Sequence, residues 1–505
     1  METQNIIYGV PSQALPMPDQ YQRLVHLDLK GAPPKMDYLL KVFPLFKEWG
    51  ATGLLVEYED TFPYTGELDV LQKGDEFYNS ADVATLQQAA KSLDLEYIPL
   101  IQTFGHMEFV LKHSRFTHLR EHPEDRRSLC PSHPDSIVLV RSMIDQVMAQ
   151  HPNLKYFHIG SDEVWMKKRC DKCCGRIRHS FLGEPVSLFL IHVKAVLLYL
   201  KEKYPNVRPI MWDDMLRNAK YDLLKDSKLD ELVDIMVWNY LDTSESFHNN
   251  TPGQVWRLYE KVFKNVWIAS AFKGAFGPTL FLTPELEHIR NQELWAGHLS
   301  STMPKSLNFK GIVFTGWQRY THETVLCELL PVGLPSLAFC LQTFIQGHFS
   351  EELHQSISQR LGFPQLLDLE IETNLPLSEM PVGVPMGTYP GSGVYMCARQ
   401  LATIQSSKEG QKLFRLASQS ALLKKEGEAS SSSEKPCSPL APLSDDEMGP
   451  VLSLLAKLTA LRSTADQALG EVYHPPTSKE WLDLCLMPLM KHLERRLAAT
   501  KALDH

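Results

Sequence analysis

The 505-residue chain lacks the segments that mark a secreted or membrane-spanning protein. Its start has neither a basic region nor the apolar stretch of about 7 to 15 residues that a secretory signal needs. No later segment approaches the roughly 18 consecutive apolar residues of a membrane span. The nine cysteines are odd in number and scattered, which suits a reducing compartment better than a disulfide framework. We therefore expect an intracellular protein, cytoplasmic or nuclear, with no signal peptide and no membrane partner.

Positive charge is also scarce. The chain has 51 lysines and arginines against 60 aspartates and glutamates, a formal net charge of −9. Proteins that bind nucleic acid need a basic face to displace counterions from the phosphates, so we expect no nucleic-acid partner. With 44% hydrophobic residues, the composition is that of an ordinary globular protein, long enough for one large domain and an appendage.

What the chain does contain is a regular alternation between about residues 22 and 317. Short apolar runs alternate with longer segments of helical pattern, which is the signature of repeated βαβ units. Eight runs are predicted as strands: Leu24–Leu29, Gly53–Tyr58, Tyr97–Gln102, Tyr156–Gly160, Pro209–Trp212, Val233–Trp238, Val266–Ser270 and Gly311–Thr315. They fit an α/β fold of the (β/α)8 TIM-barrel type, with a C-terminal helical extension. A doubly wound sheet is the alternative, but residues 30–34 cannot supply its glycine-rich GxGxxG turn.

The rest of the chain predicts helices around a polar linker. We expect an N-terminal extension (1–20), a TIM-barrel catalytic domain (21–345), a helical extension (346–425), a Ser/Pro/acid-rich linker or loop (426–449) and a C-terminal helical hairpin (450–505). Leucines at helical spacing mark both hairpin helices, and the second follows a capping box from Thr477 to Glu480. The two helices of the hairpin could pack on each other, on the barrel or on a second subunit, so the sequence does not decide whether the protein is a homodimer. We expect it to pack on the barrel's own helices, because apolar stripes usually mark core.

In a TIM barrel, the C-terminal ends of the strands form the active-site face. The polar and aromatic residues at these ends are Asp28, Lys30, Glu57, Glu59, Asp60, His106, Asp162, Glu163, Trp165, Trp212, Asp213, Asp214, Trp238, Asn239, Tyr240, Lys273, Trp317, Gln318, Arg319 and Tyr320. Such a set suits a sugar, because indoles stack on the C–H faces of a pyranose and carboxylates bind its hydroxyls. Trp212, Trp238 and Trp317 have the alternative of being plain barrel core, but three indoles at equivalent strand ends favour a pocket.

The most informative segment covers residues 156–165. Successive side chains of a strand point to opposite faces, so the adjacent Asp162 and Glu163 can serve one site only where the chain turns off the strand. The segment resembles the His-x-Gly-(Gly/Ser/Cys)-Asp-Glu motif of the family 20 glycoside hydrolases, the β-N-acetylhexosaminidases. Five further segments, in collinear order, resemble the hexosaminidase D branch of that family: residues 25–34, 102–108, 212–215, 269–274 and 315–320.

This resemblance implies an exo-β-N-acetylhexosaminidase that releases terminal N-acetylgalactosamine or N-acetylglucosamine from a small-molecule glycoside or glycoconjugate. It implies a retaining mechanism in which the substrate's own acetamido group is the nucleophile, with no cofactor and no metal. By resemblance, Glu163 is the general acid and base, and Asp162 holds the acetamido N–H. The implied substrate-binding residues are Asp28, His106, Trp212, Asp213, Trp238, Tyr240, Trp317 and Arg319. Lysosomal and secreted members carry an arginine where this chain has Lys30, and a glutamate near the position of Arg319.

Two other functions remain open at this stage. One is a catalytically weak sugar-binding or scaffolding barrel that acts through its C-terminal helices. The other is a chitinase-like endo-enzyme, although such enzymes space their acids as Asp-x-Glu.

The segment from Cys170 to Cys174, with His179 nearby, offers one CxxC pair and no second pair. We therefore expect free thiols on a loop here, not a metal site.

Overall fold

The computed structural model describes residues 20–411 and 443–502, apart from 73, 75–76, 166–169, 180–184, 372, 374 and 377–385. The chain forms two compact units, which divide between Ile357 and Ser358. The predicted N-terminal extension, except Gln20, and residues 426–442 of the predicted linker lie outside the described residues.

The first unit is built on a closed barrel of eight parallel strands in chain order. The strands are β1 (Gln22–Asp28), β2 (Gly53–Glu57), β3 (Glu96–Leu100), β4 (Tyr156–His158), β5 (Arg208–Trp212), β6 (Asp234–Trp238), β7 (Asn265–Lys273) and β8 (Asn308–Gly316). Val25 of β1 pairs with Leu54 of β2 on one side and with Phe314 of β8 on the other, which closes the ring. The predicted TIM barrel is therefore confirmed, with a strand at each of the eight predicted runs.

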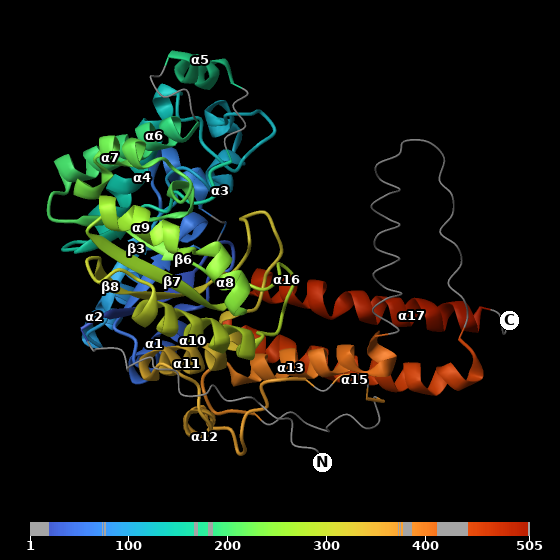
Figure 1. The fold of residues 1–505 in the computed structure, drawn as a ribbon. Coiled ribbons are helices and arrows are strands. Elements are labelled where there is room, and N and C mark those ends of the chain that lie inside the picture. The colour runs from blue at the N-terminus through green and yellow to red at the C-terminus, as the bar shows by residue number, and fades with distance from the viewer. Residues whose placement is uncertain are drawn as a thin grey trace. The chain divides into compact units, whose positions relative to one another are not determined.

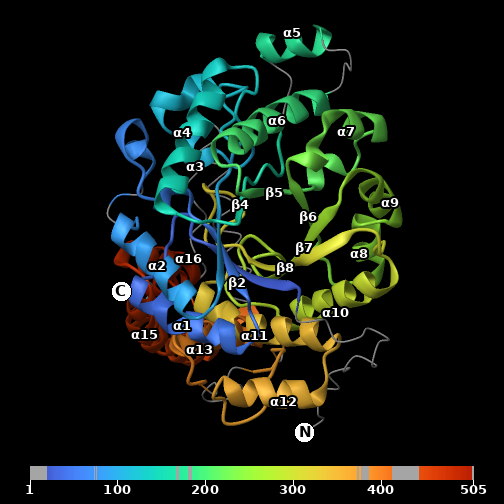
Figure 2. The ribbon, with the colours of Figure 1, turned by 90° about the vertical axis from the view of Figure 1, so that its left-hand side faces the viewer.

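Helices surround the strands (Figure 2). The α-helices described in this part of the chain are α1 (Met36–Glu48), α2 (Ser80–Ser92), α3 (Glu108–Leu111), α4 (Pro134–Gln150), α5 (Asp171–His179), α6 (Pro185–Lys203), α7 (Tyr221–Ser227), α8 (Ser244–Asn250), α9 (Gly253–Val262), α10 (Glu285–Ser301) and α11 (Leu330–Gln346). The next helix, α12 (Glu351–Arg360), contains the boundary between the two units. Among the described residues, none of the helices combines the length and the apolar character needed to cross a bilayer.

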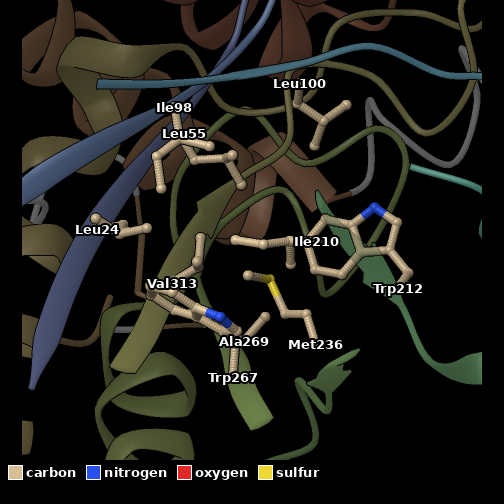
Figure 3. Packing of buried hydrophobic residues seen from close by; sticks show 10 residues of the cluster. All are labelled: Leu24, Leu55, Ile98, Leu100, Ile210, Trp212, Met236, Trp267, Ala269 and Val313. Atoms are coloured by element: carbon tan, nitrogen blue, oxygen red, sulfur yellow. The ribbon is translucent and has the colours of Figure 1, made fainter. Parts of the chain in front are cut away.

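The interior of the barrel is filled by side chains, as is usual for this fold. Figure 3 shows ten of them converging from seven strands: Leu24, Leu55, Ile98, Leu100, Ile210, Trp212, Met236, Trp267, Ala269 and Val313. Each is at most 1% exposed. Trp212 belongs to this cluster although it sits at the end of β5, so the core reaches the active-site face at that point.

The second unit consists of α13 (Ser392–Ser406), α15 (Asp445–Val472), α16 (Pro475–Cys485) and α17 (Met487–Lys501). The stripe Leu454, Leu458 and Leu461 is buried, and α15 packs on α13, α16 and α17 (Figure 1).

The C-terminal helices differ from the predictions at three points. The chain is already helical from Asp445, inside the predicted linker, and the second predicted helix is divided at Leu486, where Pro488 opens α17. The helix expected to start at the capping box begins at Pro475 instead, with Thr477 buried inside it.

Candidate active site

A cavity of about 200 Å³ opens at the C-terminal ends of the barrel strands. It is lined by Lys30, Gln102, His106, Asp162, Glu163, Trp212, Trp238, Tyr240, Gly274, Ala275, Trp317, Arg319 and Tyr320. Eight of the ten residues predicted from the resemblance are therefore brought together around one hollow: Asp162, Glu163, His106, Trp212, Trp238, Tyr240, Trp317 and Arg319.

The turn that follows β4 aims both acids into this hollow. Gly160, Ser161 and Glu163 have φ angles of 61°, 68° and 43°. These values lie in the left-handed region, which residues other than glycine rarely adopt. A β-carbon on Gly160 would lie 2.1 Å from the Gln102 side chain, so the position needs glycine for space as well as for φ. The backbone strain at Ser161 and Glu163 lies at the residues with candidate chemistry, where such strain tends to concentrate.

The loop after β3 lies directly against this turn. A β-carbon on Gly105 would come within 2.1 Å of the Asp162 carbonyl oxygen, so only glycine permits the close approach. The approach brings His106 to both acids, with its Nε2 atom 3.3 Å from Asp162 Oδ2 and 3.5 Å from Glu163 Oε2. The imidazole therefore bridges the two carboxylates.

The pKa values of His106 and Glu163 are both raised. Burial alone would lower the pKa of His106, but the Asp162 carboxylate outweighs it and raises that pKa to about 10, so the ring is a cation near neutral pH. Burial also raises the pKa of Glu163; the His106 charge opposes the shift and the Asp162 charge adds to it. Glu163 thereby tends to hold its proton beside a charged neighbour, which suits a general acid.

The environment of Asp162 differs from that of Glu163. The Glu163 side chain is 46% exposed at the mouth of the cavity, whereas that of Asp162 is 10% exposed. Asp162 Oδ1 is buried and, among the described residues, has no hydrogen-bond partner. A buried oxygen of this kind is costly unless a ligand supplies a donor, so the atom is placed to accept a hydrogen bond from a bound molecule.

Aromatic rings form the walls. The rings of Trp212 and Trp317 lie 6.1 Å apart, and those of Trp238 and Tyr240 stack at 5.2 Å with an angle of 28° between their planes. Trp212 is 1% exposed and belongs both to the barrel core and to the cavity lining, while Trp238 and Trp317 are half-buried at the wall. The two interpretations of Trp212, as barrel core and as a residue of the pocket, therefore both hold.

Cations lie on the side of the cavity formed by β1 and β8. Lys30 Nζ is 2.7 Å from Asp28 Oδ2 and 5.1 Å from the centre of the Trp317 ring. Burial would lower the pKa of Lys30, but the charges of Asp28, Glu57 and Glu59 raise it, so the ammonium stays charged inside the protein. Arg319 is held by the carbonyl oxygens of Thr324 and Gly31.

Comparison with known proteins identifies the family. The model of the glycosyl hydrolase family 20 catalytic domain matches residues 38–254. The chain is 44% identical over 350 residues to hexosaminidase D of Bos taurus, covering 69% of this chain and 99% of that protein. It is 38% identical over 479 residues to hexosaminidase D of Homo sapiens, covering 94% and 93% of the two chains. The chain belongs to glycosyl hydrolase family 20.

The similarity to hexosaminidase D covers most of this chain, so the chain falls in that branch of the family and is a glycoside hydrolase. A solved β-N-acetylhexosaminidase structure from Bacteroides fragilis matches with 16% identity and a TM-score of 0.49, over 64% of this chain and 66% of that one.

Two predicted substrate-binding residues of this family 20 hydrolase do not line the cavity. Asp28 is buried beneath it, where it binds Lys30 and accepts a hydrogen bond from the Gln318 N–H at 2.8 Å. Asp213 faces away, in an ion pair with Arg217 and a 2.9 Å hydrogen bond from the Tyr259 hydroxyl. Asp28 therefore positions Lys30, which lines the cavity, and Asp213 is held by residues outside the cavity lining.

Asp214, the neighbour of Asp213, faces Asp162 and Glu163. Its carboxylate accepts hydrogen bonds from the Glu163 N–H at 3.0 Å and from Trp238 Nε1 at 3.3 Å. Burial and the charge of Asp162 raise the pKa of Asp214 to about 7. A 3-10 turn begins directly after Asp213 and decides which of the two aspartates faces Glu163. The sequence pattern did not reveal this turn.

Several residues that line the cavity were missed. Gln102 donates to Glu57 Oε1 at 3.1 Å and accepts from the Ser161 N–H at 3.3 Å, so it connects β2 and β3 to the turn after β4. Gly274 and Ala275 also line the hollow, together with Lys30 and Tyr320, which were named as strand-end residues but not among the ten site residues. All of these residues lie at or just after the end of a strand, and this position is the signal by which the sequence marks them as candidates. Which of the candidates face the cavity depends on the directions of their side chains, which the sequence does not give.

The cysteine segment also differs from its prediction. Cys173 and Cys174 lie in the first turn of α5 and not on a loop, and Cys170 directly precedes this helix. Cys130, from the connection between β3 and α4, joins Cys170 and Cys173, a contact that spacing along the chain does not reveal.

Proposed function

We propose that this chain is an exo-β-N-acetylhexosaminidase that acts by retaining, substrate-assisted catalysis. The named relatives are hexosaminidases. The observation that carries the proposal is the division of roles within one pair of acids. Glu163 is exposed at the mouth with a raised pKa, and Asp162 is buried beside it with an oxygen free to bind. Among the described residues that line the cavity, these are the only two carboxylates, and with Glu163 as the acid and Asp162 holding the acetamido N–H, the nucleophile is the substrate's own acetamido group.

In the first step, Glu163 donates its proton to the glycosidic oxygen. The acetamido carbonyl oxygen of the substrate attacks C1, the bond from C1 to the glycosidic oxygen breaks, and the aglycone leaves with the proton. Asp162 accepts a hydrogen bond from the acetamido N–H, which aims the carbonyl oxygen at C1, and its negative charge stabilises the oxazolinium that forms.

In the second step, the ionised Glu163 takes a proton from a water molecule, and the oxygen of that water attacks C1. The bond from C1 to the acetamido oxygen breaks, and the amide is restored. Two displacements at C1 leave the sugar with its original anomeric configuration. The pair of acids and the substrate's own amide account for both steps.

The walls of the cavity suit one terminal sugar. Trp212, Trp238 and Trp317 offer faces for the acetamido methyl and the pyranose ring. Lys30 and Arg319 are charged groups in the same lining, and we propose that they bind the sugar hydroxyls, a set that includes the O4 by which N-acetylglucosamine and N-acetylgalactosamine differ.

A substrate comparison tests the proposed function. We expect release of p-nitrophenol from the N-acetyl-β-glucosaminide or the N-acetyl-β-galactosaminide, and no measurable release from the β-glucoside, which lacks the acetamido nucleophile. The ratio of kcat/KM for the two N-acetyl sugars gives the preference at O4. Binding of both N-acetyl sugars without cleavage of either would contradict the proposal and favour a sugar-binding barrel.

Substitution of His106 by glutamine is expected to move the alkaline limb of the pH profile. The proposed acid must be protonated, so kcat/KM falls as pH rises through the pKa of Glu163. The His106 cation lowers that pKa, whereas a neutral glutamine does not, so the limb in His106→Gln shifts to higher pH. The measurement is kcat/KM against pH for both proteins.

The matched control is His118→Gln, at an exposed histidine in the same connection between β3 and α4. We expect this variant to keep the wild-type profile. An alkaline limb that stays in place or moves to lower pH in His106→Gln would contradict the assignment of the cation to Glu163.

A further inference from the structure

A cluster of three thiols lies outside the sugar cavity. Cys130 Sγ is 3.6 Å from Cys170 Sγ and 3.6 Å from Cys173 Sγ, and all three sulfur atoms lie within 4.8 Å of one another. Cys130 and Cys173 are buried, and Cys170 is half-buried. Two sulfur atoms in a disulfide are about 2.05 Å apart, so this spacing is not that of a disulfide, and a disulfide would leave the third thiol unused.

The spacing is that of ligands around one metal ion. Zinc binds thiolates at about 2.3 Å in tetrahedral geometry, which places neighbouring sulfur atoms about 3.8 Å apart. The two measured separations of 3.6 Å approach this value. Thiolates are soft ligands that select zinc over magnesium or calcium. We propose that Cys130, Cys170 and Cys173 bind one Zn²⁺ ion.

The surrounding backbone favours ligand thiolates. The Cys173 N–H donates to Cys170 Sγ at 3.2 Å, so the start of α5 supplies a donor to a sulfur atom that carries negative charge when it binds metal. The backbone of Cys130 is fixed by three hydrogen bonds: its own N–H donates to the Leu119 carbonyl oxygen, and its carbonyl oxygen accepts from the His133 N–H and the Ser136 hydroxyl. Leu188 and Ile177 pack around the cluster and cover it.

The ion would join two connections that carry proposed site residues. Cys130 belongs to the connection between β3 and α4, which holds His106 at its start. Cys170 and Cys173 belong to the connection after β4, which begins with Asp162 and Glu163. Other contacts join the same connections, from the Trp165 N–H to Ser128 Oγ at 3.2 Å and from Arg176 Nη1 to the Pro131 carbonyl oxygen at 3.0 Å. The zinc site thus acts as a structural clip and takes no part in the proposed proton transfers.

Metal analysis of the purified full-length chain tests this proposal. The protein is expressed without a metal-binding tag, purified without chelators and measured by plasma mass spectrometry. We expect one zinc per chain in the wild type and a loss of at least about tenfold in Cys130→Ser and Cys173→Ser, since a site with two thiolates binds zinc far more weakly. Cys485→Ser, at a cysteine in α16 of the second unit, is the matched control and should keep the full zinc content.

A second measurement serves if the serine variants fail to fold. The wild-type protein, with its metal removed by a chelator, is titrated with Co²⁺; a charge-transfer band from at least three thiolates is expected, saturating at one equivalent. Wild-type protein that contains no zinc and takes up no metal would overturn the proposal. So would a mass two protons lower under non-reducing conditions, which would assign the cluster to a disulfide. Neither readout depends on glycosidase activity.

Discussion

Replacement of Glu163 by glutamine is expected to lower kcat/KM for aryl N-acetyl-β-hexosaminides by about 10² to 10⁴-fold, the usual contribution of a general acid and base. Glutamine keeps the shape of the side chain but has no acidic proton to give to the glycosidic oxygen. The position is 46% exposed at the mouth of the cavity, so the fold should tolerate the change. Steady-state kinetics, with circular dichroism as a check on folding, measure the effect.

Substrates with different leaving groups provide a more specific test of the role of Glu163. A glycoside whose phenol leaves readily needs little protonation, so the first step in Glu163→Gln should be impaired least with dinitrophenyl substrates and most with alkyl glycosides. Azide, which attacks C1 without a general base, should restore turnover of the good leaving groups and yield the β-glycosyl azide. Glu245→Gln, at an exposed glutamate of α8, is the control and should match the wild type. Undiminished activity in Glu163→Gln would refute its assignment as the acid.

Replacement of Asp162 by asparagine is expected to lower kcat/KM by about 10² to 10³-fold, the range for losing one electrostatic contact to a transition state. Asparagine is nearly isosteric but neutral, so the oxazolinium loses the negative charge beside it. The change also removes the charge that raises the pKa of His106 and adds to that of Glu163, so the effect extends to the proton donor. The measurement is again steady-state kinetics on folded protein.

The dependence on the leaving group separates the two variants. At a pH where Glu163 is protonated in both proteins, the loss in Asp162→Asn should be similar for good and poor leaving groups, because Glu163 still donates its proton. A thiazoline analogue of the oxazoline should also bind more weakly to this variant than to the wild type. Asp222→Asn, at an exposed aspartate in the first turn of α7, serves as control. Equal binding of the analogue to Asp162→Asn and wild type would argue against a role of Asp162 toward the acetamido group.

The sequence allowed the barrel and the turn after β4 to be predicted because both depend on local pattern. Strands that are buried on both faces read as short apolar runs, and the helices between them show their own periodicity. The end of β4 was recognisable because residues 156–165 carry two adjacent acids and resemble the family 20 motif, and the structure has left-handed φ angles at Gly160, Ser161 and Glu163.

Contacts between distant segments could not be predicted in the same way. The pattern favoured Asp213 as a cavity residue, but a 3-10 turn after β5 directs it to Arg217 and leaves Asp214 beside Glu163. Cys130 is 40 residues from Cys170, and only the folding of two barrel connections brings them together. In both cases the decisive factor is the direction of a side chain after a loop, which residue spacing does not encode.

The reactivity of a series of substrates fluorinated on the acetamido group tests the central claim most directly. Each fluorine withdraws electrons from the carbonyl oxygen and weakens it as a nucleophile, while the sugar ring and leaving group stay the same. If the substrate's amide attacks C1, log(kcat/KM) of the wild-type enzyme should fall steeply and linearly from the acetyl to the trifluoroacetyl sugar. If kcat/KM were unaffected by fluorination, the amide would not be the nucleophile, and the roles assigned to Asp162 and Glu163 would be wrong.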